Sequence, residues 1–277
     1  MISSPTVSKR AIRSHYDLAT LFCRLLWGPH IHHGLWESEE PARLAVDRLT
    51  DTLAREAKIG RGESVLDVGC GMGGSSIRLA RQLECHVTGV TLSPLQRAWA
   101  VASARWHGVA GRTEFRCEDV ERAALEASTF DVVWSVECTE HLFDKAEFFR
   151  RAAVWLRPGG RLAICAWLAG DDTLDEAAKR CVLDVCEGFL CPSLGTWADY
   201  SDWIGGAGLT LERQLDWTAH VTRTWEICEK RVRRSGVRWL ARFVDPDIAR
   251  FLDRFRTILT AYRTGAMKYG CFVARVA

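Results

Sequence analysis

The sequence predicts an α/β fold organised around a parallel β-sheet. An apolar run rich in β-branched residues at 65–68 is followed by four glycines within six positions, 69–74, and then by apolar residues at helical spacing over 77–83. Runs typical of strands and of helices keep alternating to about residue 167, which is the pattern of a parallel sheet. A strand, a glycine-rich turn and a helix start are typical of a cofactor cradle, because glycines allow close backbone approach and the helix offers unpaired N–H groups.

The composition is that of an ordinary globular chain, with 277 residues of which 48% are hydrophobic and 26% charged. A formal net charge of +2 gives no general attraction to nucleic acid, membranes or acidic partners. Arg24 interrupts the apolar stretch 18–27, and no run approaches the roughly 20 apolar residues of a membrane span. We therefore expect a cytoplasmic protein without stable membrane insertion, and one domain over 1–277, since no repeat or linker divides the chain.

Cysteine is frequent but shows no metal-binding pattern. There are eleven cysteines and no C-x-x-C pair. Cys181 and Cys186 are five positions apart on an expected helix, so at about 100° per residue they face different directions. Reduced, buried thiols are common in intracellular enzymes of this size. We expect free cysteines and no bound metal.

The N-terminal region is expected to be helical over about 12–58, after a loose leader at 1–11. Apolar residues recur at helical spacing before a loop at 28–36. Ser38 is then expected to cap a second helix, with Pro41 in its first turn.

The core of the fold is expected over about 62–217 and 268–277. Ser93 and Pro94 predict the start of a helix, because serine is a preferred N-cap residue and proline a preferred first helical residue. The strands predicted from residue type and spacing lie near 64–68, 86–91, 112–116, 130–135 and 160–167.

Two later stretches, about 171–191 and 218–267, predict a helical cap. Their apolar residues recur at helical spacing. The clearest helical face consists of Ile248, Phe251, Leu252, Phe255, Ile258, Leu259 and Tyr262. Ligands bind beyond the carboxyl ends of the strands in open α/β sheets, so a cap there would cover the acceptor substrate, with residues 224–228 at its root.

The glycine turn leaves two cofactor classes to separate. Gly69, Gly71 and Gly74 match the spacing of a dinucleotide fingerprint. However, Asp67 directly before the turn would repel a pyrophosphate and accept hydrogen bonds from an amino group. The acidic residue expected about 20 positions later is also missing, since 88–91 reads Thr-Gly-Val-Thr. A cofactor with an ammonium group and no phosphate fits better, which indicates S-adenosylmethionine (SAM).

Five segments in order resemble the motifs of class I SAM-dependent methyltransferases. Asp67–Gly73 is similar to their motif I, and the other four segments are 87–96, 118–120, 134–141 and 156–160. The likeness extends over roughly 12–277 and is strongest to the γ-tocopherol methyltransferases and their natural-product relatives; sterol methyltransferases and cyclopropane fatty-acid synthases are more distant. The resemblance implies a Rossmann-like, mostly parallel sheet that closes with an antiparallel hairpin, with strands near 209–217 and 268–275.

The resemblance also implies a set of cofactor contacts. Gly69, Gly71 and Gly73 would contact the methionine part through their backbone. Asp67 would contact the cofactor indirectly, or else only cap the glycine loop. Thr91 and Gln96 would replace the usual acidic ribose clamp, although Gln96 could simply be an exposed helix residue; an amide and a hydroxyl can still bond two ribose hydroxyls. The adenine would lie near Glu118, Asp119 and Val120, and Tyr16 and Trp27 would close over the cofactor or belong to the core.

Catalytic candidates follow the fourth strand and the N-terminal loop. Glu140 and His141 point toward the methyl group in relatives, so either could accept a proton from the acceptor, and Glu140 could stabilise a carbocation. His32 and His33 form a second candidate pair, or are exposed polar residues. With His30 they lack the cysteine or carboxylate spacing of a metal site. Residues 137–138 are expected near the acceptor side.

The expected acceptor is an apolar natural product, namely a prenylated aromatic, terpenoid or indole alkaloid, with carbon methylation favoured over N- or O-methylation. The aromatic residues of the cap would line its pocket or pack in the core. The basic run 223–238 is either a solvated helix face or a phosphate patch for a prenyl diphosphate. Rival hypotheses are a SAM-binding cyclase, a nucleic-acid or protein methyltransferase, and a nicotinamide oxidoreductase. We expect no nucleic-acid partner and a monomer or homodimer.

Overall fold

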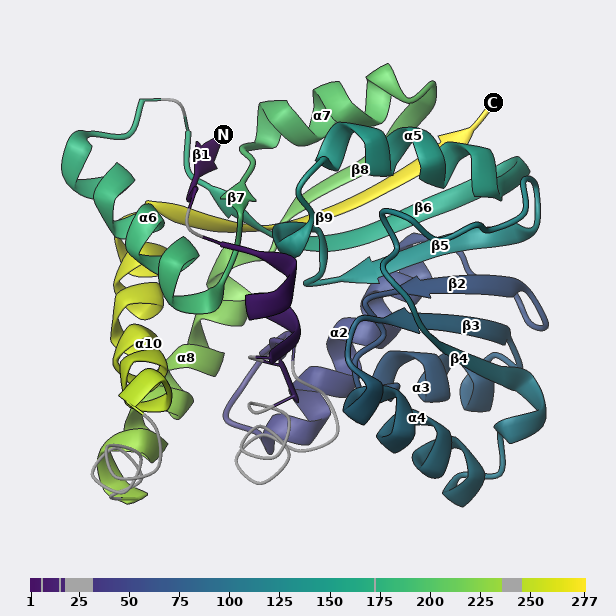
Figure 1. Cartoon of the computed structure of the whole chain (residues 1–277), viewed down its shortest axis with the longest axis horizontal. Coiled ribbons are helices and arrows are strands. Elements are labelled where there is room, and N and C mark those ends of the chain that lie inside the picture. The colour runs from purple at the N-terminus through teal and green to yellow at the C-terminus, as the bar shows by residue number, and fades with distance from the viewer. Residues whose placement is uncertain (6, 15, 18–31, 172, 236–245) are drawn as a thin grey trace.

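The computed structural model describes residues 1–5, 7–14, 16–17, 32–171, 173–235 and 246–277. Seven strands form one sheet in the order β4-β3-β2-β5-β6-β9-β8, and two short strands, β1 and β7, pair separately (Figure 1). The strands of the large sheet are β2 (Ser64–Val68), β3 (His86–Thr91), β4 (Thr113–Cys117), β5 (Phe130–Val136), β6 (Leu156–Ala169), β8 (Leu209–Asp216) and β9 (Met267–Val276).

The direction of the strands confirms the expected topology. The pairs β2–β3, β2–β5, β3–β4 and β5–β6 are parallel. Strand β9 lies between β6 and β8 and is antiparallel to both. The sheet is therefore mostly parallel with an antiparallel closing hairpin. The fold class is confirmed, and the five strands expected from the alternation are all present.

Helices cover both faces of the sheet and one end of it. In Figure 1, α5 and α7 lie at the top of the view, α3 and α4 lie at the bottom, and α6, α8 and α10 gather beyond the left-hand ends of the strands. We call α6, α8 and α10 the cap helices. The bounds are α2 (Ala42–Glu56), α3 (Gly74–Gln82), α4 (Pro94–Trp106), α5 (Lys145–Trp155), α6 (Glu176–Phe189), α7 (Trp197–Gly206), α8 (Thr218–Ser235) and α10 (Pro246–Thr264).

The strands are buried on both faces, which explains their continuous apolar runs. Side chains alternate across a strand, so Val65 packs with residues of α2, α3 and α4, while Leu66 and Val68 pack with residues of α5 and α7. Phe148 and Phe149 of α5 are fully buried in the second of these cores.

Two details of the N-terminal region differ from expectation. Ser38 does not cap α2, which begins after Pro41. A proline biases the residue before it toward extended backbone, so the helix starts only beyond it. Residues 1–11 are not a loose leader: Ile2–Ser3 forms β1 and pairs with β7 (Ser193–Leu194), and residues 9–14 are helical. By contrast, Ser93 does cap α4, because its Oγ accepts from the Gln96 N–H at 3.0 Å.

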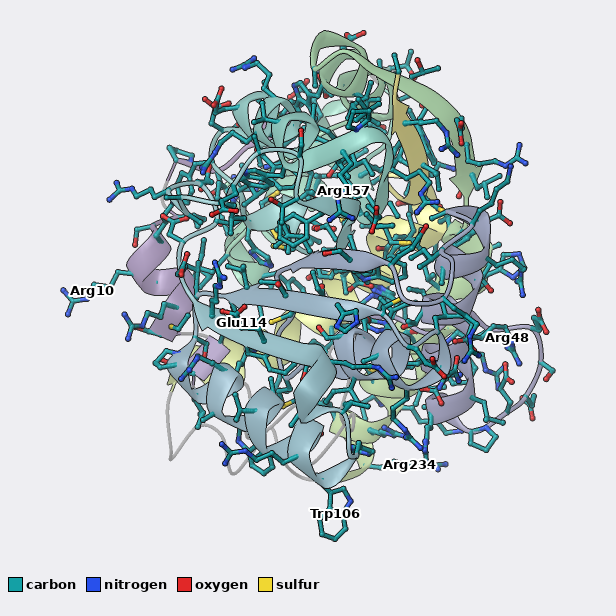
Figure 2. All side chains as sticks on the ribbon, turned by 90° about the vertical axis from the view of Figure 1, so that its right-hand side faces the viewer. Arg10, Arg48, Trp106, Glu114, Arg157 and Arg234 are labelled. Carbon is teal, nitrogen blue, oxygen red and sulfur yellow. The ribbon has the colours of Figure 1, made fainter. Side chains whose placement is uncertain are left out.

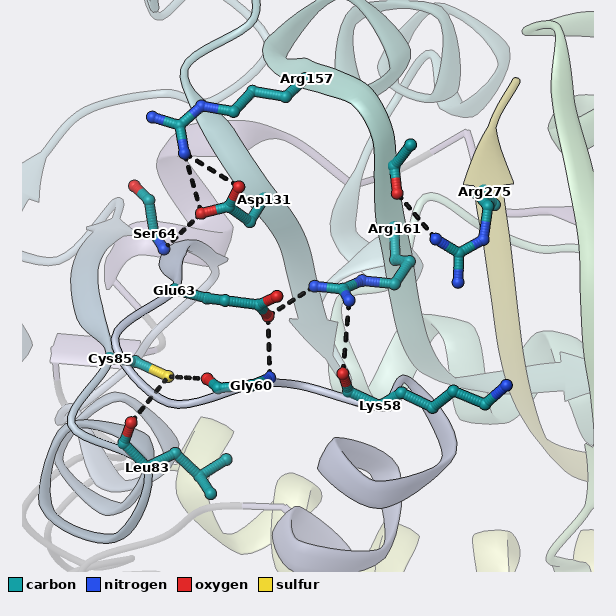
Figure 3. A network of polar contacts seen from close by, with 11 residues as sticks. Lys58, Gly60, Glu63, Ser64, Leu83, Cys85, Asp131, Arg157, Arg161 and Arg275 are labelled. Carbon is teal, nitrogen blue, oxygen red and sulfur yellow. Dashed lines mark hydrogen bonds and ion pairs between the residues drawn. The ribbon is translucent and has the colours of Figure 1, made fainter.

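A polar network fixes the amino ends of the strands (Figure 3). The Asp131 carboxylate accepts from the Ser64 N–H at 2.8 Å and from Arg157 at 2.9 Å. The Glu63 carboxylate accepts from Arg161 at 2.5 Å and from the Gly60 N–H at 3.0 Å. These bonds hold the loops at the amino ends of the strands. The glycine turn lies at the opposite, carboxyl ends.

Cysteine side chains in the described residues are free thiols, and most of them are buried. Within the same ranges, no group of three or more histidine, cysteine or acidic residues is arranged to hold a metal ion.

Candidate active site

The glycine turn lies between β2 and α3 and forms the floor of a cavity. Gly69 and Gly73 have φ values of +77° and +81°, which favour glycine over residues with a side chain. A Cβ on Gly69 would lie 2.4 Å from the Cys138 Sγ, so only glycine fits against the end of β5. Gly69 and Gly71 line the cavity, whereas Gly73 is the N-cap of α3 and does not.

Asp67 is tied to the first turn of α3. Its Oδ2 accepts from the Ser76 hydroxyl at 2.5 Å. It also lines the cavity and is almost fully buried. Burial raises its pKa to about 6, an effect that the hydrogen bonds from Ser76 partly offset. A buried carboxylate beside the turn is a suitable partner for an ammonium group.

Thr91 and Gln96 both line the cavity next to the glycine turn. The Thr91 hydroxyl donates to the Gln96 Oε1 at 3.0 Å and accepts from the Ser93 N–H at 3.3 Å. Gln96 is buried rather than exposed. Two hydroxyl-binding groups are thus held together at the carboxyl end of β3, as the resemblance implied for a ribose site.

The expected adenine end contains Glu118, Asp119 and Val120, all of which line the cavity. Asp119 is already engaged on both oxygens. Its Oδ1 accepts from the Glu121 N–H at 3.1 Å, and its Oδ2 pairs with the ammonium of Lys9. Lys9 itself lines the cavity.

The N-terminal helical residues lie across the cavity. Ile12 and Tyr16 line it, and Trp27 is outside the described residues. The Tyr16 hydroxyl is 2.6 Å from the His141 Nε2, and the His141 Nδ1 is 3.1 Å from the Leu190 carbonyl oxygen. A carbonyl only accepts, so Nδ1 carries a proton.

Glu140 lines the cavity and is 1% exposed. It belongs to a short 3₁₀ turn after β5, Thr139–His141. One carboxyl oxygen accepts from the Trp167 backbone N–H. Burial raises the pKa of Glu140 to about 8, despite this hydrogen bond. At neutral pH the group is therefore mainly a neutral acid, and a minor fraction is a base.

The two candidate histidines of the N-terminal loop have different environments. His32 lines the cavity, and its Nδ1 donates to the His33 carbonyl oxygen at 2.8 Å. Burial lowers the pKa of His32, which favours the neutral ring that a base requires. His33 is not among the residues that line the cavity.

His33 instead joins four elements. Its Nδ1 donates to Glu137 at 2.9 Å, and its Nε2 accepts from the Trp225 indole at 2.5 Å. Glu137 also accepts from the Tyr269 hydroxyl at 2.8 Å. Burial would raise the pKa of Glu137, but the electrostatic interaction with His33 and the hydrogen bonds from it outweigh burial and lower the pKa of Glu137 to about 2. The geometry of His33 is therefore that of a structural residue.

Aromatic side chains form the cavity wall on the side of the cap helices. Phe189 of α6, Trp225 of α8 and Phe255 of α10 line the cavity together with Trp167 of β6. Their ring centroids lie 5.2–6.3 Å apart, in edge-to-face and stacked pairs. We call these four residues the aromatic wall. Ile248 and Phe251 of the expected helical face belong to α10, but the positions of their side chains are outside what the structure describes.

The charges around the cavity fit a cationic cofactor. The carboxyl groups among the lining residues are Asp67, Glu118, Asp119, Glu121, Glu137 and Glu140. Among the described lining residues, Lys9 is the one basic residue of the lysine or arginine type. It is paired with the carboxylates of Asp119 and Glu121. Such a site favours a donor with sulfonium and ammonium groups and opposes a pyrophosphate. The backbone of Gly69, which packs closely against Cys138, forms the remaining part of the cofactor cradle.

Comparisons with known proteins agree with this geometry. Residues 65–160 match a family described as "Methyltransferase domain". The chain is 30% identical to a "Probable tocopherol O-methyltransferase, chloroplastic" of Oryza sativa subsp. japonica, over 85% of this chain and 68% of the relative. It is 33% identical to "27-O-demethylrifamycin SV methyltransferase" of Amycolatopsis mediterranei (strain S699), over 81% and 82%. The solved structure of the "[4+2]-Cyclase SpnF" superposes with a TM-score of 0.84 at 24% identity, covering 99% of this chain and 98% of that one.

The fold and the site thus define a class I methyltransferase. The chain belongs to the SAM-dependent methyltransferase family, in the branch that resembles the tocopherol methyltransferases. It is an enzyme that acts on small molecules with SAM as the methyl donor. Among the described helices, none combines the length and apolar character that a bilayer crossing requires.

Sequence reasoning missed several residues that line the cavity. Lys9 and Ile12 lie in or next to the segment expected to be a leader, and no motif marks them. Trp167 closes the predicted strand 160–167, and the carboxyl end of a parallel strand is where ligands bind, so its position was a usable signal. Phe189 lies in the stretch 171–191, for which the helical spacing predicted a helix but not a position in the cavity wall.

Proposed function

We propose that this enzyme methylates an apolar small molecule, namely a prenylated aromatic, a terpenoid or an indole alkaloid, and that carbon is its favoured acceptor atom. The observation that carries this proposal is the aromatic wall, which faces the cavity beside the buried carboxyl group of Glu140. Pockets for apolar ligands are lined mainly by aromatic and aliphatic side chains with a few polar groups that fix orientation.

The residues of the site have three tasks. The cofactor supplies an electrophilic methyl group when it is bound. The aromatic wall and the N-terminal helix exclude water and orient the acceptor, and orientation can account for ~7–11 kcal/mol of a barrier. When a carbon acceptor is attacked, positive charge develops on it, and the faces of Trp167, Trp225 and their neighbours can stabilise a cation.

A proton must then leave the acceptor. Glu140, with a pKa of about 8, can take that proton in its ionised fraction. His32 is a second base, kept neutral by burial, and would serve for a phenol or amine acceptor. His141, bonded to Tyr16 and Leu190, is held in a single orientation at the same side.

The acceptor is proposed to lack a diphosphate. In the described part of the basic run, Arg223 bonds to Glu39 and stacks over Trp36 at 5.5 Å, and Arg233 pairs with Glu229. Among the described residues of this run, 223–235, only Trp225 lines the cavity. This favours the solvated helix face; residues 236–238 are outside the described residues.

Incubation with methyl-labelled SAM and a panel of acceptors tests the proposal. The panel contains geraniol, geranyl diphosphate, a prenylated hydroquinone and an indole. We expect a methylene-sized mass gain on an uncharged member, with the new methyl assigned to carbon by NMR. Glu140→Gln and His141→Ala should lower turnover more than SAM affinity.

Two outcomes would contradict the proposal. Methylation of the diphosphate alone would overturn the uncharged acceptor. Tight SAM binding without any labelled product across the panel, together with conversion of an acceptor to an isomer of equal mass, would favour the SAM-binding cyclase. The similarity of the fold to a cyclase makes this the alternative to test.

A further inference from the structure

Lys9 forms an ionic contact that joins the N-terminal helical segment to the adenine end of the cavity. Its Nζ pairs with the Asp119 carboxylate and lies 2.8 Å from the Glu121 carboxylate. The three side chains are 31%, 21% and 12% exposed, so the contact is partly shielded from water. The ammonium also lies 5.9 Å from the centre of the Phe143 ring. These contacts raise the pKa of Lys9 although burial opposes the shift.

The partners of Lys9 are themselves fixed to the cavity rim. Glu121 accepts from the backbone N–H groups of Phe143 and Asp144, at 3.0 and 2.8 Å. Asp144 is the N-cap residue of α5. A single ammonium group therefore connects the N-terminal helical segment, the loop after β4 and the start of α5.

Two further contacts hold the same segment across the cavity. The Tyr16 hydroxyl is bonded to His141 at the acceptor side, and Asp17 accepts from the Ser93 hydroxyl at 2.5 Å near the expected ribose site. Ile12, which is 1% exposed, lies between these points and lines the cavity. The segment thus reaches from the adenine end of the cavity, at Lys9, to the side where His141 lies.

We propose that Lys9 is a positioning residue that keeps the N-terminal segment closed over the bound cofactor and thereby sets the rate at which S-adenosylhomocysteine leaves. Lys9 offsets the repulsion between Asp119 and Glu121, which would otherwise disfavour the closed arrangement. Ion pairs of this kind are weakened by salt. The inference depends on the use of SAM and is independent of the proposed acceptor.

The test compares product release from Lys9→Met, Lys9→Arg and the control Arg10→Met. Arg10 is the next residue, it is exposed, and it is directed into solvent (Figure 2). Bound tritiated S-adenosylhomocysteine is chased with unlabelled compound. We expect release to be about fivefold faster in Lys9→Met, the size of effect that two partly shielded ion pairs give. Lys9→Arg and Arg10→Met should keep the wild-type rate.

Salt dependence gives a readout that needs no variant. Between about 0.05 M and about 0.5 M salt, where screening becomes severalfold shorter in range, release from the wild type should accelerate, and release from Lys9→Met should change much less. The KM for SAM should rise in Lys9→Met and keep the wild-type value in Arg10→Met. Equal release rates in wild type and Lys9→Met, an equal increase in Arg10→Met, or a salt response that persists in Lys9→Met would each overturn the proposal.

Discussion

Asp67 occupies the point where the fold and the cofactor site meet. It is buried at the end of β2, it accepts a hydrogen bond from the Ser76 hydroxyl of α3, and it lines the cavity. Burial of a carboxylate is unfavourable unless hydrogen bonds or a cation compensate for it. The Ser76 hydroxyl compensates in part, and the ammonium of a bound SAM would add the opposite charge.

Replacement of Asp67 separates these two roles. We expect Asp67→Ala to raise the dissociation constant of SAM by about tenfold or more, because a charge-assisted contact is lost. Isothermal titration measures this. The matched control is Ser76→Ala, which removes the hydrogen bond from the Ser76 hydroxyl to Asp67 and keeps the carboxylate. An unchanged SAM affinity in Asp67→Ala, or an equal loss in Ser76→Ala, would contradict the assignment of Asp67 to the cofactor.

The raised pKa of Glu140 predicts how the stability of the folded chain depends on pH. Its folded-state pKa of about 8 lies above the ordinary value of 4.5, so between these values the folded state binds a proton that the unfolded state has lost. Stability then falls as pH rises through this window, by up to about 1.4 kcal/mol per pH unit. We expect Glu140→Gln to remove this loss, so that its melting temperature exceeds that of the wild type increasingly between about pH 5 and pH 8.

Thermal unfolding at several pH values checks this expectation. Lys145, whose pKa burial lowers to about 8, changes its contribution only above that pH, so it leaves the window clear. Parallel pH curves for wild type and Glu140→Gln would show that Glu140 titrates normally in the folded chain.

At this scale, the residues of contiguous motifs were the ones that the sequence located. Asp67, Thr91, Gln96 and Asp119 all line the cavity, because each lies at the carboxyl end of a strand or in the segment that follows it. Lys9 could not be found in this way, since its role depends on a pairing with residues 110 positions away.

The loop before α2 is held by contacts from elements distant in sequence. The ring of His33 contacts Glu137 after β5 and Trp225 of α8, and packs 5.1 Å from Tyr269 of β9. Glu137 has a φ of +52°, which is uncommon for a residue with a side chain. The contacts with His33 and Tyr269 maintain this conformation and fix His32 at the cavity.

We expect His33→Ala to lower the free energy of unfolding by about 3 kcal/mol, because it removes the imidazole that pairs with the buried carboxylate of Glu137. The Tyr269 hydroxyl and the backbone N–H of residue 33 remain as donors to that carboxylate. Denaturant titration measures the change. Glu39→Gln is the matched control. It breaks the ion pair between the exposed Glu39 and Arg223 of α8, and it should leave the free energy of unfolding unchanged. A similar value for the wild type and His33→Ala would contradict the structural role of His33.

Elements with strong local signals were predictable, and those with weak ones were not. Ser93 and Pro94 located the start of α4 because capping is a local effect. Helix α7 has a capping box at Thr196 and Asp199, but its position beside α5 depends on packing that no spacing reveals. Likewise, serine is a preferred N-cap residue, but α2 begins only after Pro41 and not after Ser38.

For the whole molecule, the alternation of strands and helices predicted the parallel part of the sheet, and the resemblance to a family supplied the antiparallel closing hairpin. The position of the cap helices depends on long-range contacts of α10 with α6 and α8. Periodicity located helical faces in these segments but could not say which rings would meet in the aromatic wall.

The order of the chain divides the cavity into two regions. Residues up to Leu142 supply the glycine turn and the expected ribose and adenine contacts, whereas the aromatic wall begins at Trp167. Helix α6 follows β6, and α8 and α10 connect β8 to β9; these three strands are neighbours in the sheet. A change of sequence within α8 or α10 can therefore alter the aromatic wall without altering the glycine turn, because separate stretches of the chain supply the two.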